Sequence, residues 1–161
     1  MVVVLLIIIQ FSLGAVRDLA PLPPLGQRSL PVIDVDTPEV APEVETACTS
    51  LISSLPLTLD GQPSRPVRSS LPTAYAWGGD PTVLRCGVPR PAGFLAGVGT
   101  LVINEVEWFF EPSAAGTTYT AVDRGTYIEV SAPSSVDGGA VLAILAPIIV
   151  AVLPYVAPTP G

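Results

Sequence analysis

Histidine and lysine are both absent from the 161-residue chain. Without histidine, the chain lacks the side chain that most often acts as a general base, a zinc ligand or a pH switch. All seven cationic side chains are arginines, and 14 carboxylates give a formal net charge of -7 at pH 7. This charge repels a phosphate backbone, so we expect no nucleic-acid partner. We assign no catalytic residue, metal site or cofactor.

Charged residues are also scarce, at 13% of the chain, whereas hydrophobic residues make up 49%. The length is enough for one domain with appendages, and the apolar content is enough to fill its core. The 19 prolines favour stiff connections between the elements. We therefore expect one folded domain with a weakly charged surface.

The first 16 residues carry no ionisable side chain, and residues 2–9 are all valine, leucine or isoleucine. This pattern predicts a signal peptide or transmembrane anchor over residues 1–16, and a buried core element is the alternative. The only cation ahead of Arg17 is the terminal amine, so we expect the basic flank of such a segment to lie upstream. The protein is then expected in the cell membrane on its extracytoplasmic face, or secreted, with the membrane as a partner.

Prolines interrupt residues 17–43, which predicts an extended linker between the membrane and the folded part. The extracytoplasmic domain is expected over residues 44–154, and a tail over residues 155–161. Apolar residues recur at helical spacing from Val44 to Leu55, so we expect a helix to open this domain.

Cys48 lies on the apolar stripe of this helix, and Cys86 lies farther along in a stretch that is typical of a strand. Two cysteines downstream of an export segment can persist as a disulfide outside the reducing cytosol. We therefore predict a Cys48–Cys86 bond that ties the opening helix to the sheet. An inert core thiol is the alternative for Cys48.

Alternating apolar residues and turn signals predict several antiparallel strands in the second half of the chain. Strand character begins at residues 82–86. Asn104-Glu105 is expected to form a two-residue hairpin turn. Asp123-Arg124-Gly125 is expected to form a three-residue hairpin loop, with the glycine at a positive φ. Together these signals predict a small antiparallel β-meander of about four to five strands.

Residues 140–157 form a second uncharged stretch. Asp137 ahead of it is suited to a helix start, because a carboxylate is favourable at the positive end of the helix dipole. We predict a helix over residues 138–153, kinked at Pro147 and packed on the sheet. A second membrane segment over residues 140–157 is the alternative. The expected fold class is α+β, with two helices on one face of the meander.

Three side chains near the second cysteine are candidates for ligand binding. Arg85 and Arg90 would clamp an anion or carboxylate beside a loop over residues 77–91. The alternative is a pair of surface arginines that balance an acidic chain. Trp77 would provide an aromatic wall for a sugar or peptide, and packing of the loop against the sheet is the alternative.

The same segment carries a family resemblance. The matching pieces are Ala47-Cys48, Trp77–Pro81, Leu84–Pro91, Val106–Phe109 and Leu145–Pro147. Over roughly residues 44–154 the chain resembles the uncharacterised actinobacterial membrane or secreted proteins of domain-of-unknown-function family three-five-one-five. The resemblance implies an N-terminal membrane helix and a small outward-facing domain, with no known activity. The chain departs from the family's pattern in its missing N-terminal basic flank and its more apolar last helix.

Three functions are compatible with these observations. The first is a non-catalytic envelope domain that binds or supports other envelope components. The second is a domain that binds a small anion, peptide or sugar through residues 77–91. The third is a hydrolase with an unrecognised carboxylate site. A concave pocket with an exposed arginine at residues 77–91 would favour the second, and two carboxyl groups converging in a cleft would favour the third.

Overall fold

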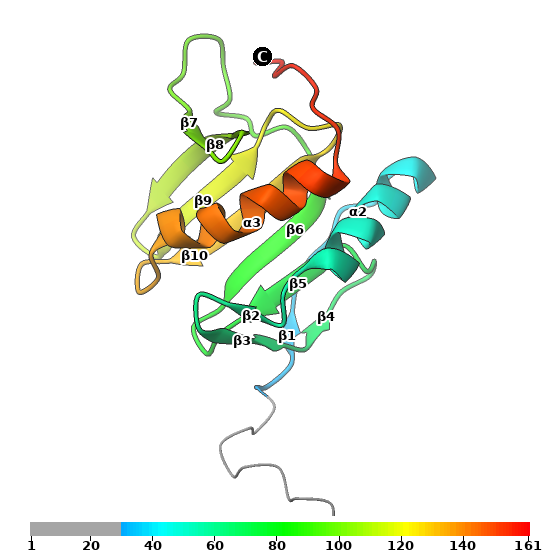
Figure 1. Cartoon of the computed structure of the whole chain (residues 1–161), viewed down its shortest axis with the longest axis vertical. Coiled ribbons are helices and arrows are strands. Elements are labelled where there is room, and N and C mark those ends of the chain that lie inside the picture. The colour runs from blue at the N-terminus through cyan, green and yellow to red at the C-terminus, as the bar shows by residue number, and fades with distance from the viewer. Residues whose placement is uncertain (1–29) are drawn as a thin grey trace, which may run out of the picture.

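The protein folds into one eight-stranded antiparallel sheet with two helices across one face (Figure 1). This is a computed structural model, and it describes residues 30–161. The predicted membrane or signal segment over residues 1–16 lies outside the described residues. The α+β fold class is confirmed. The prediction of four to five strands is wrong, because several strands are too short to show an alternating pattern.

The elements follow the chain in a simple order. They are β1 (Ile33–Asp34), α2 (Pro42–Ser54), β2 (Thr58–Leu59), β3 (Gln62–Arg65), β4 (Val67–Arg68), β5 (Ala74–Trp77), β6 (Thr82–Val88), β7 (Leu101–Ile103), β8 (Val106–Ser113), β9 (Gly116–Ala121), β10 (Tyr127–Pro133) and α3 (Gly138–Val152). Strands β1 and β4 form a separate parallel pair. The main sheet has the order β2-β3-β5-β6-β10-β9-β8-β7.

The sheet consists of two local halves that meet at its centre. One half contains β2, β3, β5 and β6, and the other is the meander β7 to β10. The seam between them is the antiparallel pair β6–β10, in which Cys86 lies opposite Ile128. Residues 89–100 carry the chain from β6 to the far edge, and on the way Phe94 packs on Phe109 and Val122. The non-local seam is why a simple meander did not describe the topology.

The main core lies between the sheet and the two helices. Side chains on β6 and β10 alternate between buried and half-buried, as expected for strands with one face on a core. Leu84 and Ile128 on these strands pack with Leu51 of α2 and Leu145 of α3 in one apolar cluster. Both helices therefore cover the same face of the sheet, as predicted, and burial of this apolar area supplies most of the driving force for folding.

Helix α2 begins at Pro42, which is tolerated in a first turn because that position needs no backbone N–H donor. Glu43 and Glu45 lie in the same turn, where carboxylates are favourable. Cys48 and Leu51 are fully buried along the predicted apolar stripe. The periodicity alone was therefore enough to find this helix.

Helix α3 begins after Asp137, whose Oδ1 accepts a hydrogen bond from the Ala140 backbone N–H at 3.2 Å. Pro147 lies inside the helix, so it donates no bond to the carbonyl of Ala143, four residues earlier. Asn104 replaces that donor, with its Nδ2 2.9 Å from the Ala143 oxygen. The helix packs on the sheet as predicted. No helix within residues 30–161 is long and apolar enough to cross a membrane.

The two predicted turns have different outcomes. Asn104 and Glu105 have φ values of 46° and 67° and form the predicted two-residue turn between β7 and β8. The three-residue loop at Asp123-Arg124-Gly125 is wrong, because β9 and β10 begin pairing only at Ala121 and Ile128. The connection is longer because Asp123 and Arg124 turn inward instead of facing solvent.

Segments expected outside the domain also pack on it. Residues 30–41 belong to the predicted linker, yet Ile33 pairs with Val67 and Thr37 is buried. In the tail, the Val156 N–H donates to the Asp123 carbonyl at 3.0 Å. The folded unit therefore includes both flanks of the expected domain.

Candidate functional site

Cys48 and Cys86 lie at disulfide distance, as predicted. Their Sγ atoms are 2.04 Å apart, their Cα atoms are 5.5 Å apart, and both residues are 0% exposed. The bond ties α2 to the central strand β6. Gly87 follows with φ 84°, and a Cβ there would lie 2.7 Å from Cγ1 of Val40. Glycine at this position therefore lets residue 40 approach the strand beside the disulfide.

Residues 77–91 do not form one loop, because residues 82–88 form the central strand β6, which confirms the strand character predicted at residues 82–86. Trp77 ends β5 and is only 1% exposed. Its Nε1 donates to the Pro56 carbonyl at 2.8 Å, and its ring centroid lies 4.7 Å from that of Tyr75. The packing alternative therefore describes Trp77, and its ring presents no wall to a ligand.

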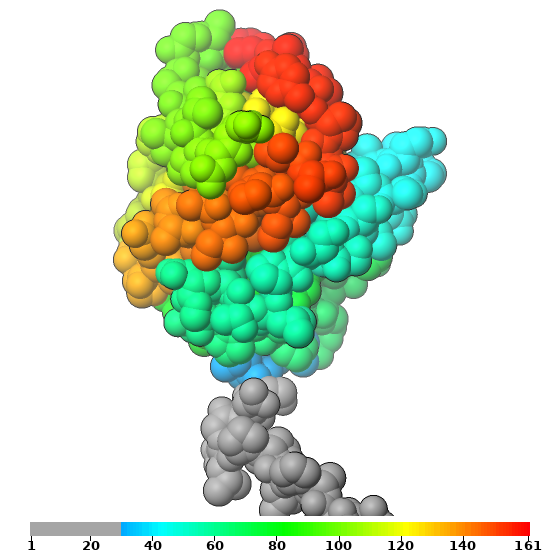
Figure 2. Space-filling model, viewed as in Figure 1, coloured from blue at the N-terminus to red at the C-terminus, as the bar shows by residue number. Residues whose placement is uncertain are grey.

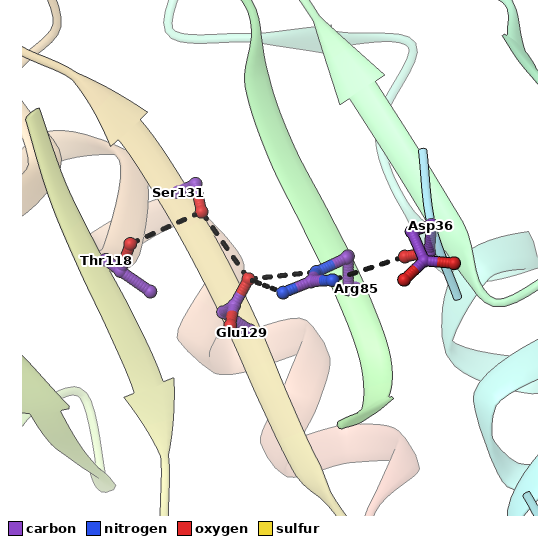
Figure 3. Close-up of polar contacts among 5 residues, drawn as sticks. All are labelled: Asp36, Arg85, Thr118, Glu129 and Ser131. Atoms are coloured by element: carbon purple, nitrogen blue, oxygen red, sulfur yellow. Dashed lines mark hydrogen bonds and ion pairs between the residues drawn. The ribbon is translucent and has the colours of Figure 1, made fainter. Parts of the chain in front are cut away.

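Arg85 lies on the sheet face away from the helices, and each of its three guanidinium nitrogens donates a hydrogen bond (Figure 3). Nε and Nη2 donate to Oε1 of Glu129 at 2.9 and 2.7 Å. Nη1 donates to the Asp36 carbonyl at 3.2 Å. Ser131 Oγ lies 3.5 Å from the same Glu129 oxygen and 3.5 Å from Thr118 Oγ1. Because Glu129 balances its charge, Arg85 offers no open fork to an anion.

Arg90 and Arg85 line one groove of about 480 Å³ on this outer face. Arg90 Nη1 donates to the Phe94 carbonyl at 2.9 Å, which fixes the start of the crossing segment. Glu111 and Glu129 line the same groove. The structure thus brings the two predicted arginines together. The carboxylates in the same groove would repel an anion.

A larger hollow, of about 1000 Å³, lies beside β4 and β5. Its walls include Val32, Ile52, Arg65, Arg68, Leu71 and Tyr75. Arg65 is 9% exposed and donates to three carbonyls, those of Gly78 at 2.9 Å, Gly79 at 3.0 Å and Pro31 at 2.7 Å. Within residues 30–161 no acidic side chain forms an ion pair with Arg65.

The burial of Arg65 is a finding of the structure. Its partners at residues 31 and 78–79 come from distant parts of the chain, so no local pattern indicates the burial. Arg68, in contrast, is exposed, and its Nη1 lies 2.9 Å from Oδ1 of Asp34. Exposed ion pairs contribute little, so a ligand can displace this one at low cost.

A buried charged pair, Asp123 and Arg124, lies in the connection between β9 and β10. Asp123 Oδ1 and Arg124 Nε are 3.8 Å apart. Arg124 Nη2 donates to the Glu105 carbonyl at 2.6 Å, and its guanidinium lies 5.9 Å from the Tyr155 ring centroid. Burial raises the pKa of Asp123, while the Glu107 backbone amide and Arg124 partly oppose that shift. The pair fastens the β7–β8 turn and the tail to the sheet.

No curated protein and no solved structure matches the chain. A family model does match, and it covers residues 1–157, which is nearly the whole chain. The match includes the apolar N-terminal run as well as the folded domain. The resemblance inferred from the pieces around the two cysteines is therefore confirmed. The chain belongs to the family described as Protein of unknown function (DUF3515).

Proposed function

We propose that the protein is a non-catalytic domain of the cell envelope, held on the extracytoplasmic side of the membrane by residues 1–16, that binds or supports another envelope component. The buried Cys48–Cys86 disulfide carries this proposal. A structural disulfide persists outside the reducing cytosol. Both sulfurs lie inside the main core, so the domain depends on oxidation for its full stability.

The polar groups of the outer face support a role other than catalysis. Arg85 and Glu129 neutralise one another, and the buried carboxyl of Asp123 faces Arg124 inside the fold. The chain has no histidine to activate a hydroxyl nucleophile. These groups stabilise the domain and leave its open surfaces for binding.

Localisation is tested with fusions of the full chain to a reporter that is active only outside the cytoplasm. Trapping of thiols in whole cells, followed by mass spectrometry, gives the state of Cys48 and Cys86. We expect an active reporter and an oxidised pair. The Cys48→Ala and Cys86→Ala double variant, which has no cysteine, gives the background of the trapping. An inactive reporter, or two free thiols in the wild type, contradicts the proposal.

A second candidate function is binding of a small ligand with an anionic head and an apolar body. The hollow beside β4 and β5 supports it, because the Arg65 charge has no acidic partner within residues 30–161 and aliphatic side chains form the walls. This candidate moves the predicted ligand site from residues 77–91 to the hollow, where Arg68 is exposed at the rim.

Decanoate and decanol are suitable probes for this second candidate, because they share the same alkyl chain and differ in the head, which is an anionic carboxylate in one and a neutral hydroxymethyl group in the other. We expect calorimetry on the full chain to detect decanoate and not decanol. Arg68→Gln should weaken decanoate binding, and Arg90→Gln, which changes an arginine of the outer groove, should leave it unchanged. Absence of decanoate binding, or equal loss in both variants, rules the candidate out.

A further inference from the structure

We propose that the open edge of the sheet, strand β7, pairs with β7 of a second copy of the protein about a two-fold axis at Val102. Among residues 30–161, strand β7 is the last strand on its side of the sheet and pairs only with β8 (Figure 1). In Figure 2 the green segment that contains β7 forms open surface beside α3, which is orange.

The backbone groups of Val102 point away from the sheet. In a two-residue hairpin the residues that flank the turn, here Ile103 and Val106, exchange both backbone hydrogen bonds. The next pair, Val102 and Glu107, then directs its N–H and C=O groups outward. The backbone of Glu107 confirms this direction. Its carbonyl accepts a hydrogen bond from the Val122 N–H, on the side away from β7, at 2.9 Å. Val102 therefore offers one donor and one acceptor at the open edge.

The side chains of β7 do not protect this edge. Natural edge strands are usually blunted by charge, proline, a bulge or shortness, since an open edge invites another strand. Strand β7 contains only leucine, valine and isoleucine, and Val102 is 73% exposed. The opposite edge is different, because β2 has two residues and its neighbour β3 contains Pro63. With three residues β7 is itself short, so length, and no charge, proline or bulge within the strand, limits pairing at this edge.

A second copy fits this edge because the edge is complementary to itself. Antiparallel pairing about Val102 places Leu101 of one copy opposite Ile103 of the other. Leu101 and Ile103 pair with Trp108 and Val106, so both lie on the face that carries the helices. Ile144 of α3 is 38% exposed and follows Ala143, whose carbonyl accepts a hydrogen bond from Asn104 of the β7–β8 turn. The arrangement closes on itself, whereas pairing of unlike edges would build an open fibre.

Charge also permits a second copy at this edge. Residues 91–103 carry no ionisable side chain, although the chain has a net charge of -7. The carboxylate nearest the axis belongs to Glu107, which lies opposite Val102 on β8 and accepts a hydrogen bond from Thr100 Oγ1 at 2.7 Å. The two Glu107 positions of a dimer would be three strand spacings apart, about 14 Å at about 4.8 Å per spacing. That separation exceeds the screening length of about 8 Å at physiological ionic strength.

The first test is the molar mass of the full chain in detergent micelles, measured by light scattering after size exclusion. We expect a dimer that dissociates on dilution, because the interface between the two β7 strands is short. Val102→Lys adds a charge at the axis and should give a monomer, whereas Leu57→Lys should not. Leu57 is the matched control, because it is 75% exposed and lies beside β2.

The second test is cross-linking, because a cysteine on a two-fold axis meets its own copy. Both native cysteines are paired and buried, so Val102→Cys adds one reactive thiol. We expect mild oxidation to give a covalent dimer from Val102→Cys and not from Leu57→Cys. A monomeric wild type, a dimer unaffected by Val102→Lys, or equal cross-linking of the two cysteine variants overturns the proposal.

Discussion

Asp123 shows how a single buried residue sets a pH dependence. Burial raises the pKa of Asp123 above its ordinary value of 3.8. The folded state therefore binds this proton more tightly than the unfolded chain does. Ionisation of Asp123 costs stability above its folded pKa, and that cost is relieved as the pH falls through the folded pKa toward the unfolded one. This direction is opposite to that of a carboxylate whose pKa is depressed by its partner.

We predict that Asp123→Asn changes the pH profile of unfolding. Between about pH 7 and about pH 4 the wild type should gain stability relative to the variant, because only the wild type takes up the proton. Urea unfolding at several pH values measures the difference. Asp60→Asn, at an exposed turn, gives the baseline for loss of a carboxylate. A difference between wild type and Asp123→Asn that stays constant with pH, or shrinks toward acid, contradicts the assignment.

At the scale of elements, α3 depends on a residue from a different hairpin. Pro147 leaves the Ala143 carbonyl without its helical donor, and Asn104 at the β7–β8 turn supplies one. The same residue has a positive φ that the turn requires. Asn104 therefore serves two elements. Its backbone forms the β7–β8 turn, and its side chain holds this edge hairpin on helix α3.

We predict that Asn104→Gly destabilises the protein by about 1 kcal/mol, the usual contribution of one hydrogen bond. Glycine keeps the positive φ and removes only the side-chain donor. In a Pro147→Ala background the helix regains its own donor, so Asn104→Gly should cost clearly less there. Urea unfolding of the four proteins gives this coupling. Equal costs in the two backgrounds would show that the Asn104–Ala143 bond does not replace the missing helical one.

Local patterns predicted the two helices, the turn at Asn104 and the Cys48–Cys86 pair. Each depends on periodicity, turn chemistry or the pairing of two lone cysteines. Patterns could not predict the burial of Arg65 or the inward turn of Asp123, because both require contacts from distant parts of the chain. The binding role of Trp77 failed for a related reason. A tryptophan near glycines and prolines indicates a loop. Only the strand pairing of β5 shows that Trp77 belongs to the core.

At the scale of the whole molecule, the disulfide is the main covalent restraint. We predict that the Cys48→Ala and Cys86→Ala double variant loses about 4 kcal/mol, from a closed loop with a separation of 38 residues. This is a large part of the roughly 5–15 kcal/mol typical of a domain. Urea unfolding measures the loss.

Wild type unfolded in the presence of a reductant is the matched control for this loss. It keeps both cysteine side chains, so it separates loss of the cross-link from loss of packing. The reduced wild type should lose most of the same stability as the double variant. If reduction leaves the unfolding midpoint unchanged, the bond is not a major restraint on the fold.

The β6–β10 seam has a consequence for how the chain matures. In a chain that emerges N-terminus first, one side of β6 stays unpaired until β10 appears. The residues around Cys86 pair on that side with the residues around Ile128. Long-range pairing of this kind slows folding and leaves intermediates prone to aggregation. Both cysteines precede β7, so oxidation can hold α2 on the half-built sheet during that interval. The disulfide would then restrain a folding intermediate before it stabilises the finished domain.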